Sequence, residues 1–163
     1  RQFPTSQATV PDLEAYLKQI EEERKIKLGC VVIDYINILA NYRNPNSENM
    51  YLKIKQIAED LRAMGTRNGW LIVTATQINR NNYNSSDIGM GDVAESAGLS
   101  HTADLMLGII QDDMMRASNE YWLKILKIRD GEGKGVKCKL DINYNYMRLH
   151  ETDEVSNSNI HSL

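Results

Sequence analysis

Two short apolar runs, separated by one amphipathic stretch, constrain the fold of this chain most strongly. The first run, residues 30–33 (CVVI), continues without polar alternation into Asp34, and the second covers residues 70–75 (WLIVTA). A continuous apolar run of this length is typical of a strand that is covered on both faces. Between the runs, apolar residues recur at helical spacing over residues 48–68. A strand, a helix and a strand in this order predict a βαβ unit with parallel strands.

Asp34 and Gln77 each follow one of these predicted strands. Parallel strands end at the same rim of a sheet, and ligands of open α/β folds bind at that rim. A carboxylate there can hold a magnesium ion through a water molecule, and a neutral amide can sense a terminal phosphate without titrating. The alternatives are that Asp34 caps the next turn and that Gln77 bonds to the backbone at the strand end. The residues alone leave both alternatives open.

The other elements follow from similar patterns. Thr9 and Pro11 predict the start of a helix over residues 11–27. Residues 78–92 form a long polar stretch, which predicts a functional or disordered loop. We further expect a short helix at 93–100, an apolar strand at 105–110, strands at 121–129 and 136–142 joined by a turn at 130–135, a possible third antiparallel strand at 147–149 and a disordered tail at 153–163.

Size and composition exclude several classes of protein. The 163 residues suit one domain, which we place at residues 1–152, and two small domains are the alternative that this length leaves open. The net charge of −3 excludes a global basic field. The only two cysteines, Cys30 and Cys138, lack metal-ligand or scaffold spacing and suit the reduced state of a cytoplasmic protein. Asp34 and Asn37 interrupt the longest apolar stretch, so we expect no membrane-spanning segment.

Phosphate-binding groups are sparse in the sequence. No GxxxxGK[ST] pattern occurs, and the similar residues 131–136 are better explained as a hairpin turn. Lys127 and Arg129 lie two positions apart before that turn, so they share one face of the strand. They could reach a phosphate across a subunit boundary, or they could be an ordinary solvated sheet face.

Two polar loops are candidates for nucleic-acid contact, residues 43–47 and residues 80–92. Both follow the carboxyl ends of the predicted parallel strands, on the side of the sheet where Asp34 is expected. Their polar side chains and backbone amides can bind phosphates, and many copies in a ring would add their contacts. The candidates in these loops are Arg43, Asn44, Arg80, Asn81 and Asn82.

These stretches resemble the DnaB-type hexameric replicative helicases, whose motor domain is a RecA-like P-loop NTPase core. Residues 31–38 (VVIDYINI) are similar to the Walker B strand, residues 76–80 (TQINR) to the glutamine motif and residues 127–131 (KIRDG) to the segment that carries the arginine finger. Residues 92–104 resemble the segment that begins at a DNA-contacting loop. The form found in T-even-like phages matches further stretches, such as residues 2–7 (QFPTSQ) and 40–44 (ANYRN).

The resemblance implies a role for each matching residue. Asp34 would hold the magnesium shell, Gln77 would couple the γ-phosphate of ATP to the loops, and Arg129 with Lys127 would reach the ATP of the neighbouring subunit. Glu95 and Ser96 join the DNA-contacting candidates, whereas Ala94 replaces an arginine of the bacterial pattern. The family's Walker A segment and water-activating glutamate would lie upstream of Arg1, so we expect no ATP turnover from these residues alone.

The resulting expectation is an α/β fold, part of a RecA-like core, with a parallel central sheet flanked by helices and a C-terminal antiparallel β-hairpin. Its function would be the C-terminal part of an ATP- and Mg²⁺-dependent helicase motor in a phage-infected or bacterial cell. The implied partners are single-stranded DNA, further copies in a hexameric ring and, by family, a primase and a helicase loader. The alternatives are a non-catalytic RecA-like module for assembly or single-strand binding, and a fragment of a RecA-type recombinase.

Overall fold

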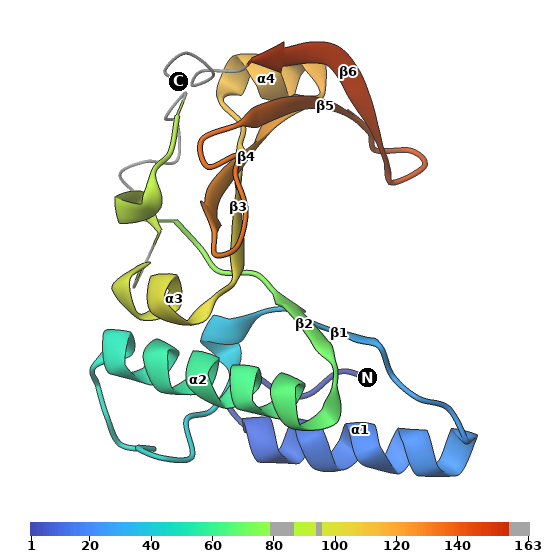
Figure 1. The fold of residues 1–163 in the computed structure, drawn as a ribbon, viewed down its shortest axis with the longest axis vertical. Helices are drawn as coiled ribbons and strands as arrows, with labels where there is room; N and C mark the ends of the chain where they lie inside the picture. Colours follow the sequence, from blue (N-terminus) through green and yellow to red (C-terminus); the bar gives the residue numbers. More distant parts are fainter. Residues whose placement is uncertain (79–86, 94–95, 157–163) are drawn as a thin grey trace. The chain divides into compact units, whose positions relative to one another are not determined.

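A computed structural model of the chain describes residues 1–78, 87–93 and 96–156, and the side chains of 96, 97 and 152–156 are not described (Figure 1). The chain divides into two compact units. Unit 1 comprises Arg1–Gln77 and Glu95–Ala103, and unit 2 comprises Ile78–Ala94 and Asp104–Leu163. Each unit has its own sheet and is described by itself below.

Unit 1 begins with helix α1 (Val10–Arg24), whose start the sequence specifies locally. The backbone N–H of Asp12 donates to the Thr9 hydroxyl oxygen (3.4 Å), and the backbone N–H of Thr9 donates to the Asp12 carboxylate (2.9 Å). This reciprocal capping box satisfies two N–H groups that a helix start leaves unpaired. The helix ends three residues before the predicted Lys27, because Lys25 adopts a left-handed conformation and caps it.

The predicted βαβ unit is present in unit 1. Strand β1 (Cys30–Ile33) runs parallel to strand β2 (Leu71–Thr74), with Cys30 opposite Leu71 and Ile33 opposite Thr74. Helix α2 (Met50–Asn68) connects them, starting at the Asn49 cap and ending at Gly69 in the left-handed region. The helix packs closely on β2, since a Cβ on Gly65 would lie 2.9 Å from both the Trp70 carbonyl oxygen and Ile72.

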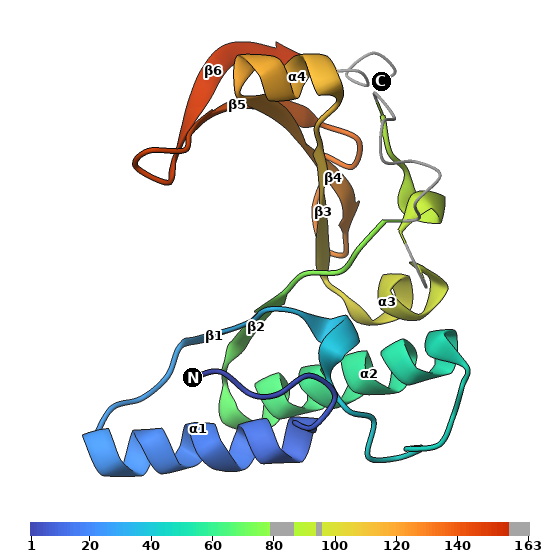
Figure 2. The ribbon, with the colours of Figure 1, turned by 180° about the vertical axis from the view of Figure 1, so that it is seen from behind.

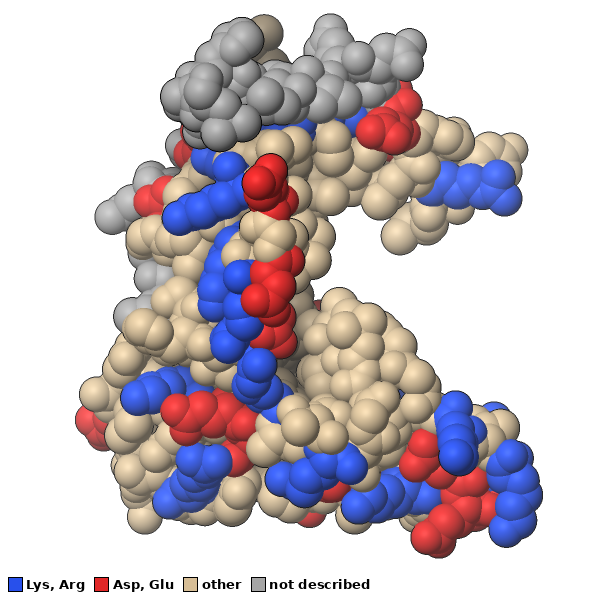
Figure 3. All heavy atoms as spheres, viewed as in Figure 1, with Lys and Arg blue, Asp and Glu red and all other residues tan. Residues whose placement is uncertain are grey.

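The expectation that both faces of these strands are covered is wrong for the described part of the chain. Val31 is 8% exposed, whereas its neighbour Val32 is 73% exposed and Leu71 is 63% exposed. The covered face packs against α2, whose buried side includes Ile54, Ile57 and Met64. Figure 2 shows α2 and α1 on one side of the β1–β2 pair, and Figure 3 shows an uncharged surface over these strands. An apolar run therefore predicts a strand without deciding how many of its faces this chain covers.

Two short helices complete unit 1. A 3-10 helix, η1 (Ile36–Ile38), follows β1 and buries Ile36. Helix α3 (Ser96–Thr102) packs along α2, and Arg62 of α2 donates to the Thr102 carbonyl oxygen at 2.6 Å. The short helix predicted at 93–100 is therefore present, shifted by a few residues toward the C-terminus.

Unit 2 is built on a four-stranded antiparallel sheet in the order β3–β4–β5–β6. The strands are β3 (Leu105–Ile110), β4 (Glu120–Ile128), β5 (Lys137–Asn143) and β6 (Arg148–Ser156), with helix α4 (Asp113–Ser118) between β3 and β4 and the 3-10 helix η3 (Met90–Asp92) before them. The predicted hairpin of β4 and β5 is confirmed.

The sequence analysis predicted an apolar strand at 105–110 without naming its partner, and the structure pairs this strand, β3, antiparallel with β4. The length of the last strand differs from the expectation. Strand β6 extends to Ser156, because Lys137 and Cys138 of β5 provide partners for its last residues. Residues 153–156 are therefore strand, although the sequence placed them in the tail, and residues 157–163 lie outside the described part.

Candidate functional site

The structure brings Asp34 and Gln77 to the same rim of unit 1. Asp34 directly follows β1, Gln77 comes three residues after the end of β2, and both side chains are exposed. The Gln77 side-chain amide donates to the Tyr35 hydroxyl at 3.4 Å. The residue after the acidic position therefore links the two strand ends, which the sequence analysis did not foresee. Strand direction was the signal that correctly placed the rim.

Further hydrogen bonds join the two chain segments just beyond the strands. The backbone N–H of Ile36 donates to the Ala75 carbonyl oxygen (3.3 Å), and the Thr76 hydroxyl donates to the Asn37 side-chain oxygen (3.0 Å). The Lys53 ammonium of α2 donates to the Asn37 carbonyl oxygen (3.3 Å). These bonds connect the segment that carries Asp34 to the segment that carries Gln77, although the pairing of β1 with β2 stops at Thr74.

Asp34 is a suitable ligand for a magnesium ion that also binds nucleotide phosphates. Among the described residues, no group of three or more His, Cys, Asp or Glu side chains could hold a metal ion by itself. Magnesium in nucleotide-binding sites keeps several water ligands and takes one or two carboxylates together with substrate phosphates. One exposed carboxylate at a strand end matches the protein's share of such a shell.

The predicted trans-acting cations lie on unit 2. Lys127 belongs to β4, opposite Met106 of β3, and Arg129 is the first residue after the strand. The Arg129 side chain forms an ion pair with Asp104 at 2.7 Å, and its backbone N–H donates to the Asp104 carbonyl oxygen at 2.8 Å. The guanidinium is therefore oriented by the residue that precedes β3, while its side chain keeps 40% of its surface exposed.

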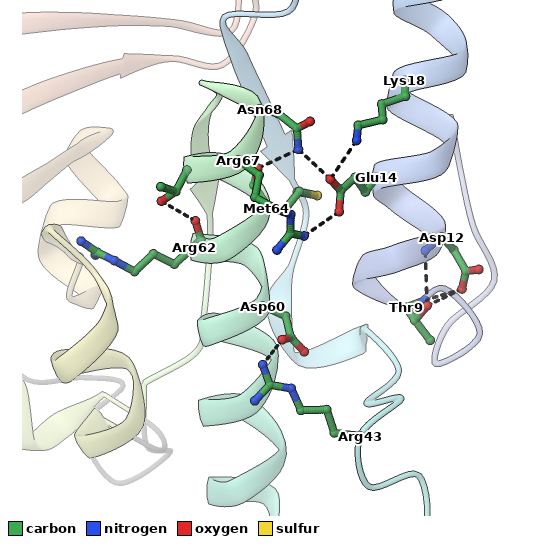
Figure 4. A network of polar contacts seen from close by, with 11 residues as sticks. Thr9, Asp12, Glu14, Lys18, Arg43, Asp60, Arg62, Met64, Arg67 and Asn68 are labelled. Atoms are coloured by element: carbon green, nitrogen blue, oxygen red, sulfur yellow. Dashed lines mark hydrogen bonds and ion pairs between the residues drawn. The ribbon is translucent and has the colours of Figure 1, made fainter.

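Arg43, a predicted DNA contact, has intramolecular partners in unit 1. Its guanidinium pairs with the buried carboxylate of Asp60 on α2 (Figure 4). It also pairs, at 3.3 Å, with Glu59 of the same helix. The Asp60 partnership raises the pKa of the Arg43 guanidinium. These contacts tie the loop after η1 to the helix, a structural role that the loop's polar composition did not reveal. The adjacent Asn44 is exposed.

The side chains of the five remaining DNA-binding candidates lie outside the described part of the structure. Four lie outside the described residues, and the fifth, Ser96, begins α3 but has no described side chain. The four are Arg80, Asn81, Asn82 and Glu95. The described ends of the 78–93 segment are joined by an antiparallel bridge between Ile78 and Val93.

Comparison with known proteins identifies the family. The family model for the C-terminal domain of DnaB-like helicases matches residues 3–151. This chain belongs to that family. A DnaB-like replicative helicase of Enterobacteria phage T4 is 34% identical over 133 residues, which cover 81% of this chain and 28% of that protein. The replicative DNA helicase DnaB of Buchnera aphidicola is 26% identical over 120 residues, which cover 72% of this chain and 25% of that protein. The chain thus spans about a quarter of these curated relatives.

Solved structures support the fold assignment. One of them, described as an ATPase domain, superposes with a TM-score of 0.76 at 21% identity, covering 90% of this chain and 52% of that one. A DnaB-like replicative helicase, solved in a study of its interactions with primase, gives a TM-score of 0.74 at 22% identity over 87% of this chain and 34% of that one. At these identities the likeness shows the fold alone, and it confirms the predicted α/β architecture of a helicase ATPase domain. None of the described helices is long and apolar enough to span a bilayer.

Proposed function

We propose that this chain is the C-terminal part of the ATP-dependent motor of a replicative DNA helicase that unwinds duplex DNA by translocating on single-stranded DNA. The observation that carries the proposal is the shared rim of Asp34 and Gln77 on parallel strands, in a chain of this helicase family. An acid and an amide at adjacent strand ends suit a site that senses a nucleotide phosphate and its magnesium ion. The family match favours the helicase over the recombinase alternative.

Within that motor, Asp34 would orient the water shell of Mg²⁺, and Gln77 would donate its amide to the terminal phosphate of ATP. In the structure, the Gln77 amide donates to the Tyr35 hydroxyl. When ATP binds, the amide would donate to the terminal phosphate instead, so the hydrogen bond between the two strand ends would change with the nucleotide. When bound, Mg²⁺ would neutralise charge on the β- and γ-phosphates. ATP would be hydrolysed between subunits, with Arg129 and Lys127 supplied to the neighbouring subunit's nucleotide.

A ring of copies would also compensate for the low positive charge of one chain. A net charge of −3 gives one copy little long-range attraction to DNA. Six copies around one strand would make their weak phosphate contacts jointly, and the effective concentration of each added contact would raise the overall affinity. We therefore propose a hexameric ring with single-stranded DNA as ligand, and a primase and a helicase loader as partners.

The test of this proposal is Arg129→Ala in the full-length protein. We expect ATP hydrolysis to fall by about 10³-fold or more, because a trans-acting arginine stabilises charge in the transition state, whereas nucleotide binding changes little. Steady-state ATPase assays and equilibrium binding of a fluorescent nucleotide measure the two quantities. Turnover within a few-fold of the unmodified protein would contradict the arginine-finger assignment.

Two control variants separate chemistry from structure at this position. Asp104→Asn removes the partner carboxylate but keeps the guanidinium, so it should retain most of the hydrolysis rate. Lys134→Ala removes an exposed cation from the turn that follows β4, and it should have no effect. If Asp104→Asn were as damaging as Arg129→Ala, the charge of Asp104 would be needed either to orient the guanidinium or to keep unit 2 folded, and the unfolding free energy of Asp104→Asn would separate these two roles.

The 163 residues alone should not hydrolyse ATP, because they contain no GxxxxGK[ST] phosphate-binding loop. Adding the purified chain to ATP and Mg²⁺ and measuring phosphate release tests this expectation. Hydrolysis that survives purification and disappears in Asp34→Asn would show that these residues bind phosphates by another route, and it would contradict this expectation.

A further inference from the structure

A carboxylate in the second half of the predicted loop, residues 80–92, bridges two lysines of the unit 2 sheet. Asp87 accepts from the Lys124 ammonium at 2.8 Å and pairs with the Lys137 ammonium at 2.9 Å. The same Lys124 ammonium donates to the Ile88 carbonyl oxygen at 2.8 Å. Lys124 and Lys137 are largely covered, with 16% and 17% of their side-chain surfaces exposed.

The two lysines are direct cross-strand neighbours, since Lys124 of β4 lies opposite Lys137 of β5. Like charges at directly opposed positions destabilise a sheet. Asp87 supplies the compensating charge to both ammonium groups at once. Desolvation would raise the pKa of Asp87, but the hydrogen bonds and charges of the two lysines outweigh it and hold the pKa at about 2. The carboxylate is therefore charged throughout the physiological range.

The next residue of the segment fits a space on the same cross-strand row. Gly108 of β3 lies opposite Lys124, so Gly108, Lys124 and Lys137 form one row across three strands. Ile88 is 3% exposed, and a Cβ on Gly108 would lie 2.6 Å from the Ile88 Cδ1 atom. The row thus accommodates the Ile88 side chain at Gly108, where no Cβ is present, and pairs Asp87 with the ammonium groups of Lys124 and Lys137.

Residues 89–93 continue this anchored segment. The backbone N–H of Gly89 donates to the Asp92 carboxylate at 2.7 Å, which caps η3. Val93 is buried and bridges to Ile78, the last described residue before the predicted DNA-contacting positions. Residues 87–93 are therefore fixed to unit 2 by charge, by packing and by backbone bonding.

We infer that Asp87, Lys124 and Lys137 form a positioning clamp that holds residues 87–93 on the unit 2 sheet and thereby supports the response of the motor to single-stranded DNA. This inference rests on the proposed function for its ligand. Lys124 lies on β4, the strand that ends next to Arg129, so residues 87–93 and the proposed trans-acting arginine are both attached to the same strand.

The first experiment measures the anchoring itself by hydrogen–deuterium exchange in the full-length protein. Asp87→Asn keeps the size of the side chain but removes the charge, and Gly108→Ala keeps the charges but displaces Ile88. We expect both variants to speed amide exchange in residues 88–93 by about tenfold. The free energy needed to open this segment locally falls, while the sheet itself stays folded. Asp87→Glu should restore slower exchange.

The second experiment measures DNA-stimulated ATP hydrolysis of the full-length ring against the concentration of oligo(dT). Asp87→Asn and Gly108→Ala should raise the half-saturating DNA concentration about fivefold or more, the lower end of typical coupling between sites, with the rate at saturating DNA within twofold. The matched control is Glu120→Gln, which breaks the 3.1 Å ion pair of Glu120 with Lys139 between the same two strands. It should change neither measurement.

The outcomes separate this inference from the proposed function. Unchanged exchange in residues 88–93, or an equal effect of Glu120→Gln, would overturn the clamp. Faster exchange with an unchanged half-saturating DNA concentration would overturn its role in the response to DNA. If the unmodified full-length protein shows no DNA-stimulated hydrolysis, the proposed function fails, and the exchange experiment still decides whether the clamp exists.

Discussion

The two units of this chain place their functional side chains by different physical means. Unit 1 uses an apolar helix–strand core, in which Ile54 and Met64 are fully buried, and the direction of two parallel strands places Asp34 and Gln77 at one rim. Unit 2 uses ion pairs across a largely half-buried antiparallel sheet, and three of these pairs involve the lysines of β4 and β5.

This difference teaches where each unit tolerates change. Apolar packing is non-directional and is lost gradually with the area removed, whereas a charge bridge depends on both partners and leaves uncompensated charge when one is removed. Unit 1 should therefore respond most to changes of side-chain volume, and unit 2 to changes of charge. The two tryptophans allow a direct comparison, because Trp70 belongs to unit 1 and Trp122 to unit 2.

The largest effect is expected for Ile54→Ala in the core of unit 1. Removing these methyl groups from a fully buried position should lower the free energy of unfolding by about 3 kcal/mol. Urea titrations of Trp122→Phe and Trp70→Phe backgrounds follow the two units separately. The Trp70 transition should shift and the Trp122 transition should stay, whereas a joint shift would show that the units unfold as one body.

Arg43→Met should destabilise unit 1 by about 2 kcal/mol, because the carboxylate of Asp60 would remain buried without its cation. The double variant Arg43→Met with Asp60→Leu should recover most of this loss, since no buried charge remains. Urea unfolding followed by Trp70 fluorescence measures both. A double variant that is less stable than Arg43→Met alone would show that Asp60 has another stabilising partner.

Val31 and Val32 give the sharpest comparison, because identical neighbours point to opposite faces of β1. A buried hydroxyl in Val31→Thr should cost about 1.5 kcal/mol, whereas Val32→Thr should change the stability of the chain by less than about 0.5 kcal/mol. Thermal unfolding of the 163-residue chain tests the pair. Equal losses would mean that Val32 is covered in solution.

The smallest of the destabilising effects concerns Glu14, which joins α1 to α2 through Arg67 at 2.7 Å and Asn68 at 2.8 Å (Figure 4). The hydrogen bond from Arg67, followed by that from Asn68, lowers the pKa of Glu14 to about 2. A depressed carboxyl pKa stabilises the fold above the unfolded value of 4.5, and this stabilisation disappears as the pH falls toward 2.

Glu14→Gln should therefore cost about 1 kcal/mol at pH 7 and flatten the decline in stability between pH 4.5 and pH 2. Unfolding free energies measured across this range provide the test. Glu22→Gln, at an exposed position of α1, is the matched control. A decline as steep in Glu14→Gln as in the unmodified chain would assign the acid sensitivity to other carboxylates.

Local sequence patterns predicted the elements of unit 1 well. The Thr9 cap, the period of α2 and the left-handed Gly69 are decided within a few residues, and so they can be read without knowing the tertiary structure. The same holds for the β4–β5 hairpin, whose turn is rich in glycine. Chain order and strand length then implied parallel pairing, which places Asp34 and Gln77 at one rim.

Partners that lie far apart in sequence could not be predicted in this way. Nothing near Arg43 indicates Asp60 as its partner, and nothing near Asp87 indicates a lysine 37 positions later. The apolar run at residues 105–110 likewise predicted strand β3, but it did not indicate that β3 pairs with β4. Pairing depends on which surfaces meet in space, and a local pattern carries no such information.

By itself, the sequence determined the βαβ unit, the shared rim of Asp34 and Gln77 and the resemblance to replicative helicases, because strand direction and motif order are properties of the linear chain. Only the tertiary structure decided which face of β1 is covered, that Arg129 is oriented by Asp104 and that Asp87 neutralises two opposed lysines. The physical reason is that burial and charge compensation are properties of neighbours in space, which folding creates.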